Sequence, residues 1–284
     1  MRVAYLGPEG TNSHEALLAA AGSAADGQLV SLPTIHDCVV AVQEGMAERA
    51  FVPIENALEG SVNATLDALA VDARDVAIVG EHVHAIRTCL IAREPMELSA
   101  IETVHSHPQS NAQCARFLRT HLPRAAVLAA SSTAEAVRMV AEHDGTSAAL
   151  GSRTAAELYG CTVLREDVDD IAGNQTRFVW LARHDAVTGD AAAAGPSKTA
   201  IVFWGAGDEA PGWLARCLTE LADRGVNLTR IESRPRKVGL GHYMFFLDLQ
   251  GAVSDPAVAE ALGALRGHVE HLRVLGSFPA APAL

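Results

Sequence analysis

Short apolar runs alternate with helical periodicity through the first 183 residues of the chain. Each run is bounded by polar, glycine or proline positions, the pattern of strands that are buried in a sheet. Strand and helix signals that alternate in this way are typical of layered α/β domains. The predicted strands are Arg2–Leu6, Ala50–Ile54, Val76–Gly80, Thr88–Ala92, Ile101–His105 and Thr176–Leu181.

Polar side chains at fixed offsets indicate where helices begin. Asn12, Thr34 and Ser132 each precede an acidic residue by three positions, which is the spacing of a helix cap. Pro108 suits the first position of a helix that continues over Gln109–Leu118. These signals place helices directly after predicted strands.

The pattern changes after Thr188–Ser197, an Ala/Gly/Ser-rich stretch without periodicity that reads as a linker. We therefore expect a first domain over 1–183, a linker over 184–197 and a second domain over 198–277. The second domain has the order β-α-β-β-α-β of a ferredoxin-like unit. Its predicted elements are the strand Thr199–Trp204, a helix from Pro211 to Asp223, the strands Val226–Ile231 and His242–Leu249, a helix capped by Asp255, and the strand Val269–Leu275.

Charge excludes one broad class of function. The net charge is -12, the only lysines are Lys198 and Lys237, and no basic run exists that would neutralise phosphates, so we expect no nucleic-acid partner. The five cysteines form no C-x-x-C pair and are expected to be buried free thiols. The N-terminus has no secretory pattern and no apolar run spans a bilayer, so we expect a cytoplasmic protein without a membrane segment.

Four polar segments follow predicted strands, where open α/β sheets bind ligands. Each has a structural reading beside the functional one: a turn, a strand cap, a helix cap and an edge-strand arginine respectively. Functionally, the first can present backbone N–H groups to an anion, and the second a carboxylate with an amide. The third offers an imidazole and an amide, and the fourth an arginine beside a hydroxyl. The segments are Gly7–His14, Val52–Val62, Ser106–Gln109 and Asn174–Phe178.

Histidine pairs raise the question of a metal. His82 and His84, and likewise His105 and His107, project two imidazoles from one face of a strand. No third ligand accompanies either pair at a suitable spacing, so we expect no metal site.

The motifs GPEGTNSH, VPIENALEGSV, SHPQSNAQC and NQTRFVWL together resemble the prephenate dehydratase family, in order and in spacing. GVNLTRIESRP resembles the ligand motif of the ACT domain that follows such enzymes. The resemblance implies a two-lobed, type II periplasmic-binding-protein-like α/β domain with an active cleft, then a βαββαβ ACT domain. It also implies prephenate as substrate, no cofactor, a homodimer or homotetramer, and L-phenylalanine as regulator.

The resemblance also suggests roles for single residues. Arg177 is the expected clamp on a substrate carboxylate, because a guanidinium matches a carboxylate bidentately. Thr176 is expected to assist departure of the ring hydroxyl, with Glu55 as the rival acid if burial raises its pKa. Phe178 is expected along the ring. Residues assigned to substrate binding or cleft shape are Thr11, Asn56, His107, Gln109, Ser132 and Thr133.

Two positions depart from the family pattern. Trp213 replaces a small residue in the first ACT loop, and Asn12 stands where the family usually has an aromatic side chain. The residues expected to bind L-phenylalanine are Gly212, Leu214, Asn227, Leu228, Glu232, Ser233, Arg234 and Pro235.

Two other functions remain open from the sequence. An arogenate dehydratase differs only in whether the substrate side chain carries an amino or a keto group. A non-catalytic amino-acid-binding regulator would use the same two-lobed fold without turnover. A periplasmic solute receptor shares the lobes but requires an export signal, which this sequence does not display.

Overall fold

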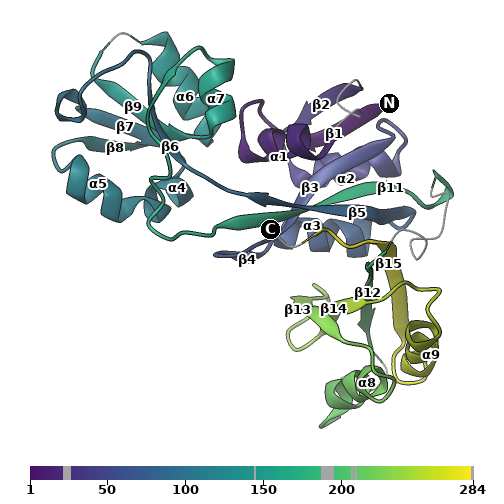
Figure 1. The fold of residues 1–284 in the computed structure, drawn as a ribbon. Coiled ribbons are helices and arrows are strands. Elements are labelled where there is room, and N and C mark those ends of the chain that lie inside the picture. The colour runs from purple at the N-terminus through teal and green to yellow at the C-terminus, as the bar shows by residue number, and fades with distance from the viewer. Residues whose placement is uncertain (22–26, 144, 187–194, 206, 208–209, 283–284) are drawn as a thin grey trace.

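A computed structural model describes residues 1–21, 27–143, 145–186, 195–205, 207 and 210–282. Three sheets organise the chain: two lobes formed from residues before Ala186, and a C-terminal unit that begins at Ser197 (Figure 1). The predicted fold class, two α/β lobes followed by a βαββαβ unit, is confirmed. None of the described helices has both the length and the apolar character needed to cross a membrane.

Lobe 1 contains the sheet β2-β1-β3-β11-β5, and the short β4 pairs with β3. Strands β1, β2 and β3 run parallel, and β11 is antiparallel to both of its neighbours. Its elements are β1 (Arg2–Leu6), α1 (Asn12–Ala21), β2 (Gln28–Leu32), α2 (Ile35–Gln43), β3 (Arg49–Asn56), β4 (Gly60–Ser61), α3 (Asn63–Asp67), the π-helix η2 (Ala68–Asp72), β5 (Val76–Ala85), β11 (Gln175–Arg183) and the 3-10 turn η4 (His184–Ala186).

Lobe 2 is inserted between β5 and β11, so two chain segments join the lobes (Figure 1). Its sheet has the order β10-β6-β9-β7-β8. Its elements are β6 (Cys89–Ala92), η3 (Leu98–Ala100), β7 (Thr103–Ser106), α4 (Pro108–Gln113), α5 (Ala115–His121), β8 (Ala126–Ala129), α6 (Thr133–Glu142), β9 (Ser147–Gly151), α7 (Arg153–Leu158) and β10 (Thr162–Arg165).

The single helix predicted over Gln109–Leu118 is wrong, because the helix breaks at Cys114 into α4 and α5. The Asp170 carboxylate accepts hydrogen bonds from the backbone N–H groups of Arg116 (2.6 Å) and Phe117 (3.0 Å). It thereby satisfies donors in the first turn of a new helix. This cap comes from a residue remote in sequence, so local periodicity could not indicate it.

The C-terminal unit has the sheet β13-β14-β12-β15 with α8 and α9 on one face. Its elements are β12 (Ser197–Trp204), α8 (Trp213–Ala222), β13 (Leu228–Pro235), β14 (Tyr243–Gln250), α9 (Pro256–Leu265) and β15 (His271–Pro279). Helix α8 begins at Trp213 rather than at Pro211, because Gly212 has the left-handed φ of +77° and precedes the helix as its cap. Most of the predicted linker, from residue 187 to residue 194, lies outside the described residues.

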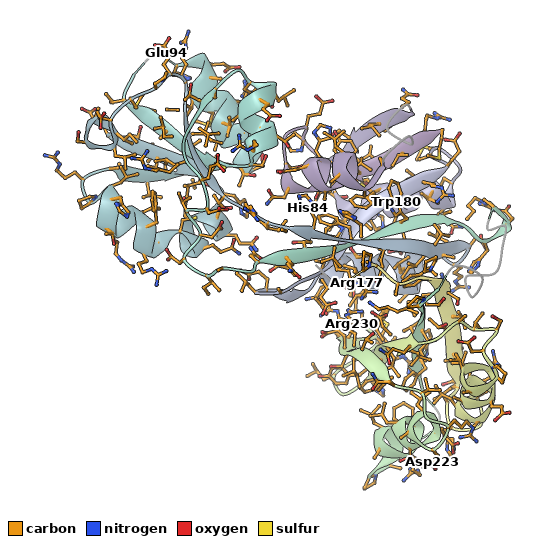
Figure 2. All side chains as sticks on the ribbon, viewed as in Figure 1. His84, Glu94, Arg177, Trp180, Asp223 and Arg230 are labelled. Carbon is orange, nitrogen blue, oxygen red and sulfur yellow. The ribbon has the colours of Figure 1, made fainter. Side chains whose placement is uncertain are left out.

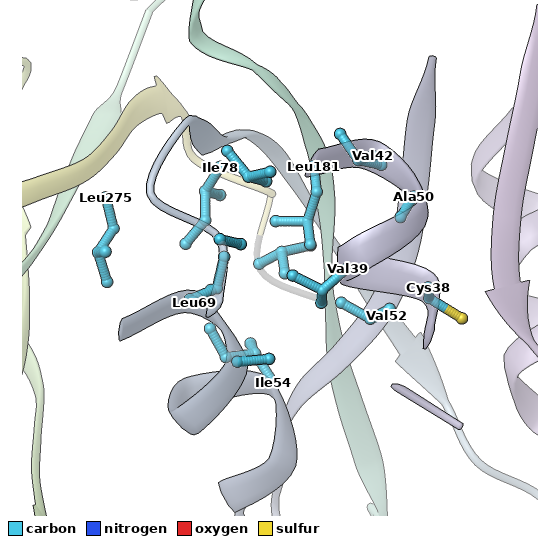
Figure 3. Packing of buried hydrophobic residues seen from close by; sticks show 14 of the residues in the cluster. Cys38, Val39, Val42, Ala50, Val52, Ile54, Leu69, Ile78, Leu181 and Leu275 are labelled. Atoms are coloured by element: carbon cyan, nitrogen blue, oxygen red, sulfur yellow. The ribbon is translucent and has the colours of Figure 1, made fainter. Parts of the chain in front are cut away.

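The other face of this sheet packs on lobe 1 and shares its hydrophobic core. Leu275 of β15 joins Ile78 of β5 and Leu69 of η2 in one buried cluster (Figure 3). The backbones approach so closely that a Cβ atom built on Gly276 would lie 2.1 Å from the carbonyl oxygen of Ile78. The two units therefore share a hydrophobic core and pack directly against each other.

We predict that Gly276→Ala destabilises the protein by about 1–3 kcal/mol, because its methyl group would meet backbone that cannot retreat without separating the units. Gly263→Ala, within α9 and facing open space, is the matched control and should be neutral or slightly stabilising. Thermal unfolding of both variants checks this. Equal melting temperatures would contradict the close packing.

Candidate active site

A cavity of about 770 Å³ lies between the two lobes. Lobe 1 contributes the loop after β1 and the end of β2, and lobe 2 contributes the starts of α4 and α6. Five of the six residues predicted to bind substrate line this cavity: Thr11, His107, Gln109, Ser132 and Thr133. Asn12 lines it too, so the departure from the family pattern lies at the cleft. Among the described residues, no lysine, arginine, aspartate or glutamate lines it.

Two helices direct their N-termini at this cavity. The Thr11 hydroxyl accepts a hydrogen bond from His14 N–H (3.4 Å) at the start of α1, so Thr11 caps this helix and the prediction of Asn12 as the cap is wrong. Ser132 Oγ accepts from Glu135 N–H (3.0 Å) at the start of α6, as predicted. Helix N-termini carry partial positive charge and attract anions. The two helix ends thus offer partial positive charge to a cavity whose described lining has no lysine or arginine.

His107 precedes α4, and its Nδ1 accepts a hydrogen bond from the backbone N–H of Gln109 (3.3 Å). An Nδ1 that accepts leaves Nε2 to carry the proton of a neutral imidazole. The remaining lining is rich in hydroxyl groups, including those of Ser31, Ser110 and Ser131. Hydroxyl and imidazole donors suit the recognition of carboxylates.

A second polar cluster lies at the start of β11, where the chain enters lobe 1 from lobe 2. Asn56 Nδ2 donates to Thr176 Oγ1 (2.9 Å) and to Asn174 Oδ1 (2.9 Å). Thr176 and Asn174 are buried. Because Thr176 Oγ1 accepts from Asn56, its own proton remains available, and within the described part of the chain the hydroxyl donates no hydrogen bond. Thr176 and Asn56, both predicted as site residues, therefore contact each other.

Arg177 is not where the sequence reasoning expected it. Consecutive residues of a strand face opposite sides, so Arg177 faces the C-terminal unit while Thr176 faces the α1 side. Figure 2 shows Arg177 and His84, the Cα partner of Thr176 on β5, on opposite sides of the sheet. Its side chain lies within a network of carboxylates and does not line the cleft. The expected carboxylate clamp is thus absent from this structure.

The Arg177 guanidinium joins the two units. Its Nε donates to Glu81 of β5 (2.6 Å), and its Nη1 donates to Asp248 of β14. Lys198 of β12 donates to the other oxygen of Glu81 (2.9 Å). The side chains of Glu81 and Asp248 are 0% and 2% exposed. Burial favours the neutral acid, but Arg177 and Lys198 outweigh it and lower the pKa of Glu81.

Glu55, the rival acid, belongs to this same network. Its carboxylate lies 3.5 Å from Arg177 Nη1 and 4.0 Å from Arg230 Nε, on the face away from Thr176. Phe178 also lies away from the position predicted for it beside the substrate ring. It is 1% exposed and stacks on Phe51 with ring centroids 4.9 Å apart, inside the core beneath α1. Neither side chain lines the cleft between the lobes.

Family models describe both parts of the chain: one described as prephenate dehydratase matches residues 3–186, and one described as the ACT domain matches residues 199–267. The chain belongs to the prephenate dehydratase family. It is 41% identical over 278 residues to the prephenate dehydratase of Amycolatopsis methanolica, covering 98% of this chain and 88% of that one.

Two solved structures are similar over nearly the whole chain. The prephenate dehydratase of Arthrobacter aurescens, in complex with L-Phe, has a TM-score of 0.89 and 37% identity and covers 100% of this chain and 92% of that one. A structure described as GqqA, a novel type of quorum quenching acylase, has a TM-score of 0.87 and 31% identity, with 99% of each chain covered.

The expected effector residues of the ACT domain fall into separate groups. Gly212 and Leu214 line a cavity of about 220 Å³ together with Tyr243 and Phe245. Trp213 also borders it, but its indole is 5% exposed and donates to the His268 carbonyl oxygen (2.7 Å), so it fills the domain core.

Strand β13 directs two of the effector candidates at the catalytic domain. Glu232 accepts from Ser61 Oγ (2.7 Å), and Arg234 donates to Asp67 (3.1 Å). Asn227 donates to Gln250 (3.1 Å), Leu228 is partly buried in the ACT core, and Ser233 and Pro235 are exposed. Within one chain, the eight residues therefore do not form a single pocket.

Sequence reasoning assigned no individual role to Asn174 or to Ser31, Ser110 and Ser131 of the cleft. Asn174 opens the NQTRFVWL motif, so the motif itself was an available signal, whereas Ser31 and Ser131 belong to no motif. Four of the five cysteines are buried and Cys161 is half-buried, and all five are free, as predicted. Across the described residues, no cluster of three or more potential metal ligands was found.

We predict that Glu81→Gln lowers the free energy of unfolding at neutral pH. We also expect this free energy to depend less on pH in the acid range than it does in the wild type. Because the pKa of Glu81 is lowered from 4.5, its contribution is present above that pH and is lost as the pH falls through the folded-state pKa. Urea unfolding from neutral to acidic pH measures this. Glu94→Gln, at the exposed far end of lobe 2, is the control (Figure 2). Parallel profiles for Glu81→Gln and the wild type would refute the pairing.

Proposed function

We propose that this chain catalyses the decarboxylating dehydration of prephenate to phenylpyruvate, a step of L-phenylalanine biosynthesis. Prephenate carries two carboxylates and a ring hydroxyl. Loss of CO2 and hydroxide together makes the ring aromatic, so the reaction balances without a cofactor. The enzyme has to hold the dianion, assist the departing hydroxide and exclude water.

The observation that carries the proposal is an uncharged, hydroxyl-rich cavity at two helix N-termini in a chain of this family. The α1 and α6 N-termini, with Thr11, Ser132 and Thr133, supply dipoles and hydrogen-bond donors for the carboxylates. A fixed dipole can stabilise an anion directly. A charged side chain would first have to lose its own counter-ion. Closure of the lobes would bring the cavity toward the Thr176 cluster at the hinge.

In this proposal Thr176 donates its hydroxyl proton in a hydrogen bond to the departing ring hydroxyl. Asn56 holds the Thr176 oxygen, so the proton is free to point away from Asn56. An alcohol is a weak acid, so the assistance is concerted with C–O cleavage rather than a prior protonation. Arg177 acts as a positioning residue that fixes the adjacent peptide from the opposite face.

We predict that Thr176→Val lowers kcat by about 100-fold or more while the fold stays intact, because valine keeps the shape and loses the donor. Thr176→Ser is the matched control and should retain most activity, since it restores the hydroxyl. Phenylpyruvate formation from prephenate gives the rate, and circular dichroism checks the fold. A Thr176→Val enzyme with wild-type kcat would remove Thr176 from the mechanism.

We further propose that L-phenylalanine lowers this activity by binding the ACT domain of a homodimer or homotetramer. The cavity beside Gly212 and Leu214 is small, and aliphatic and aromatic side chains line it. Strand β13 is an edge of its sheet and exposes Ile231, so it is available to a second subunit. A pocket completed by a partner would explain why the expected effector residues are scattered within one chain.

We predict that Leu214→Ala raises the L-phenylalanine concentration for half-maximal inhibition by about tenfold, because it removes apolar contact in that cavity. Leu218→Ala lies one turn further along α8, outside the cavity lining, and should leave inhibition unchanged at a similar cost in stability. Inhibition curves and melting temperatures separate the two effects. Wild-type activity that ignores saturating L-phenylalanine would refute sensing.

Two assays test the alternatives. The ratio of kcat/KM for prephenate and arogenate separates the two dehydratase activities, because the substrates differ at one amino or keto group.

An acylase would form or activate a nucleophile, and among the described residues of the cleft no serine hydroxyl hydrogen-bonds a histidine. We therefore favour the dehydratase, and a hydrolytic assay on an acyl amide is the control.

A further inference from the structure

A third cavity lies between the catalytic domain and the ACT domain, on the face of the ACT sheet opposite α8 and α9. Its volume is about 440 Å³, which falls within the range of small-molecule sites. The catalytic domain contributes residues of the π-helix Ala68–Asp72 and Arg74, and the ACT domain contributes the rest. It shares no lining residue with the cleft or with the cavity beside Gly212.

Three arginines converge on this cavity: Arg74, Arg236 and Arg273. Within the described part of the chain, none of them has a carboxylate at ion-pair distance. Arg273 is held by the carbonyl oxygens of Leu69 (2.7 Å) and Ala73 (2.6 Å), and its buried Nε has no partner among the described residues. In a chain of net charge -12, such an uncompensated cluster is available for an anion.

The acidic residues nearby do not neutralise the cluster. The Asp75 carboxylate accepts a hydrogen bond from Gln43 (2.8 Å). Glu270 lies 3.5 Å from His271. Burial lowers the pKa of the Arg273 guanidinium, Asp75 opposes this, and the positive charge of Arg74 adds to the lowering. A negative ligand would relieve the repulsion between these arginines.

The opposite wall is aromatic and apolar. Trp204 stacks on His271 with ring centroids 4.8 Å apart, and the Arg236 guanidinium carbon lies 5.7 Å from the Trp204 ring centroid. Met244 lies beside this wall, and Val71 of the π-helix is 56% exposed at the rim. A π-helix is uncommon and frequently accompanies a functional site. The ligand that fits both walls has a flat apolar body and one negative group.

We propose that this cavity binds a small aromatic carboxylate, with its ring against Trp204 and its carboxylate on Arg74 and Arg236. Such a ligand contacts both domains at once, so its binding favours the docked arrangement of the ACT domain. The proposal does not depend on turnover of prephenate in the cleft.

The test uses the full-length protein labelled with 5-fluorotryptophan and 3-phenylpropanoate as the ligand. The chain has three tryptophans, so ¹⁹F NMR gives three signals, and a Trp204→Phe sample assigns the Trp204 signal. We expect this signal to shift saturably during the titration. Arg74→Gln combined with Arg236→Gln should raise the Kd by about tenfold or more, whereas Arg119→Gln on the surface of lobe 2 should not change it.

The neutral 3-phenylpropanamide tests whether charge is recognised and should produce no saturable shift of the Trp204 signal. Three results would overturn the proposal: an unmoved Trp204 signal, an equal response to the amide, or an unchanged Kd in the Arg74/Arg236 double variant. Unaltered Trp180 and Trp213 signals in that variant before titration, together with normal prephenate turnover, show that it is folded.

Discussion

Arg177 lies between two carboxylates that are sealed from solvent, Glu81 of the catalytic domain and Asp248 of the ACT domain. Buried charges need partners, and the Arg177 guanidinium is a hydrogen-bonded partner of both carboxylates. The arrangement of the ACT sheet on the sheet of lobe 1 therefore depends on this set of charges. Lys198, Arg230 and Glu55 extend it along the same interface.

The neighbouring residue gives this interaction a functional meaning. Thr176 precedes Arg177 on β11 and faces the opposite side of the sheet, where Asn56 donates a hydrogen bond to its hydroxyl. Two consecutive peptide units thus connect the ACT domain on one side of the sheet with the polar cluster at the hinge on the other. A shift of the ACT sheet would reach the proposed proton donor through β11 without a long chain of contacts.

The cleft receives its positive character from helix ends rather than from arginine. The use of helix ends in place of arginine suits an acidic chain. A formal cation in the cleft would attract neighbouring carboxylates, as Arg177 does between the domains. The direction of the backbone dipoles at α1 and α6 is fixed by the helices themselves. The formal positive charge is instead used between domains, at Arg177 and at the cavity of Arg74, Arg236 and Arg273.

Much of this was predictable from local pattern. Strands β1, β3, β5, β6, β7 and β11, the caps at Thr34 and Ser132, and the βαββαβ order follow from periodicity and spacing, whereas β2, β4, β8, β9 and β10 were not predicted. Thr11 and His107 belong to motifs placed after strands, and Ser132, which lines the same cavity, was predicted as a helix cap. The side of the sheet that Arg177 faces could not be predicted. A motif does not reveal which face of a strand packs against another domain. The break at Cys114 likewise depends on Asp170, a contact that only the folded chain brings together.

The most direct test is a crystal structure of the protein with an unreactive dicarboxylate analogue of prephenate bound in the cleft. The account predicts that its carboxylates lie at the N-termini of α1 and α6, while Arg177 keeps its hydrogen bonds to Glu81 and Asp248. A guanidinium that has left those partners to grip the analogue would contradict it, and would restore Arg177 to the active site.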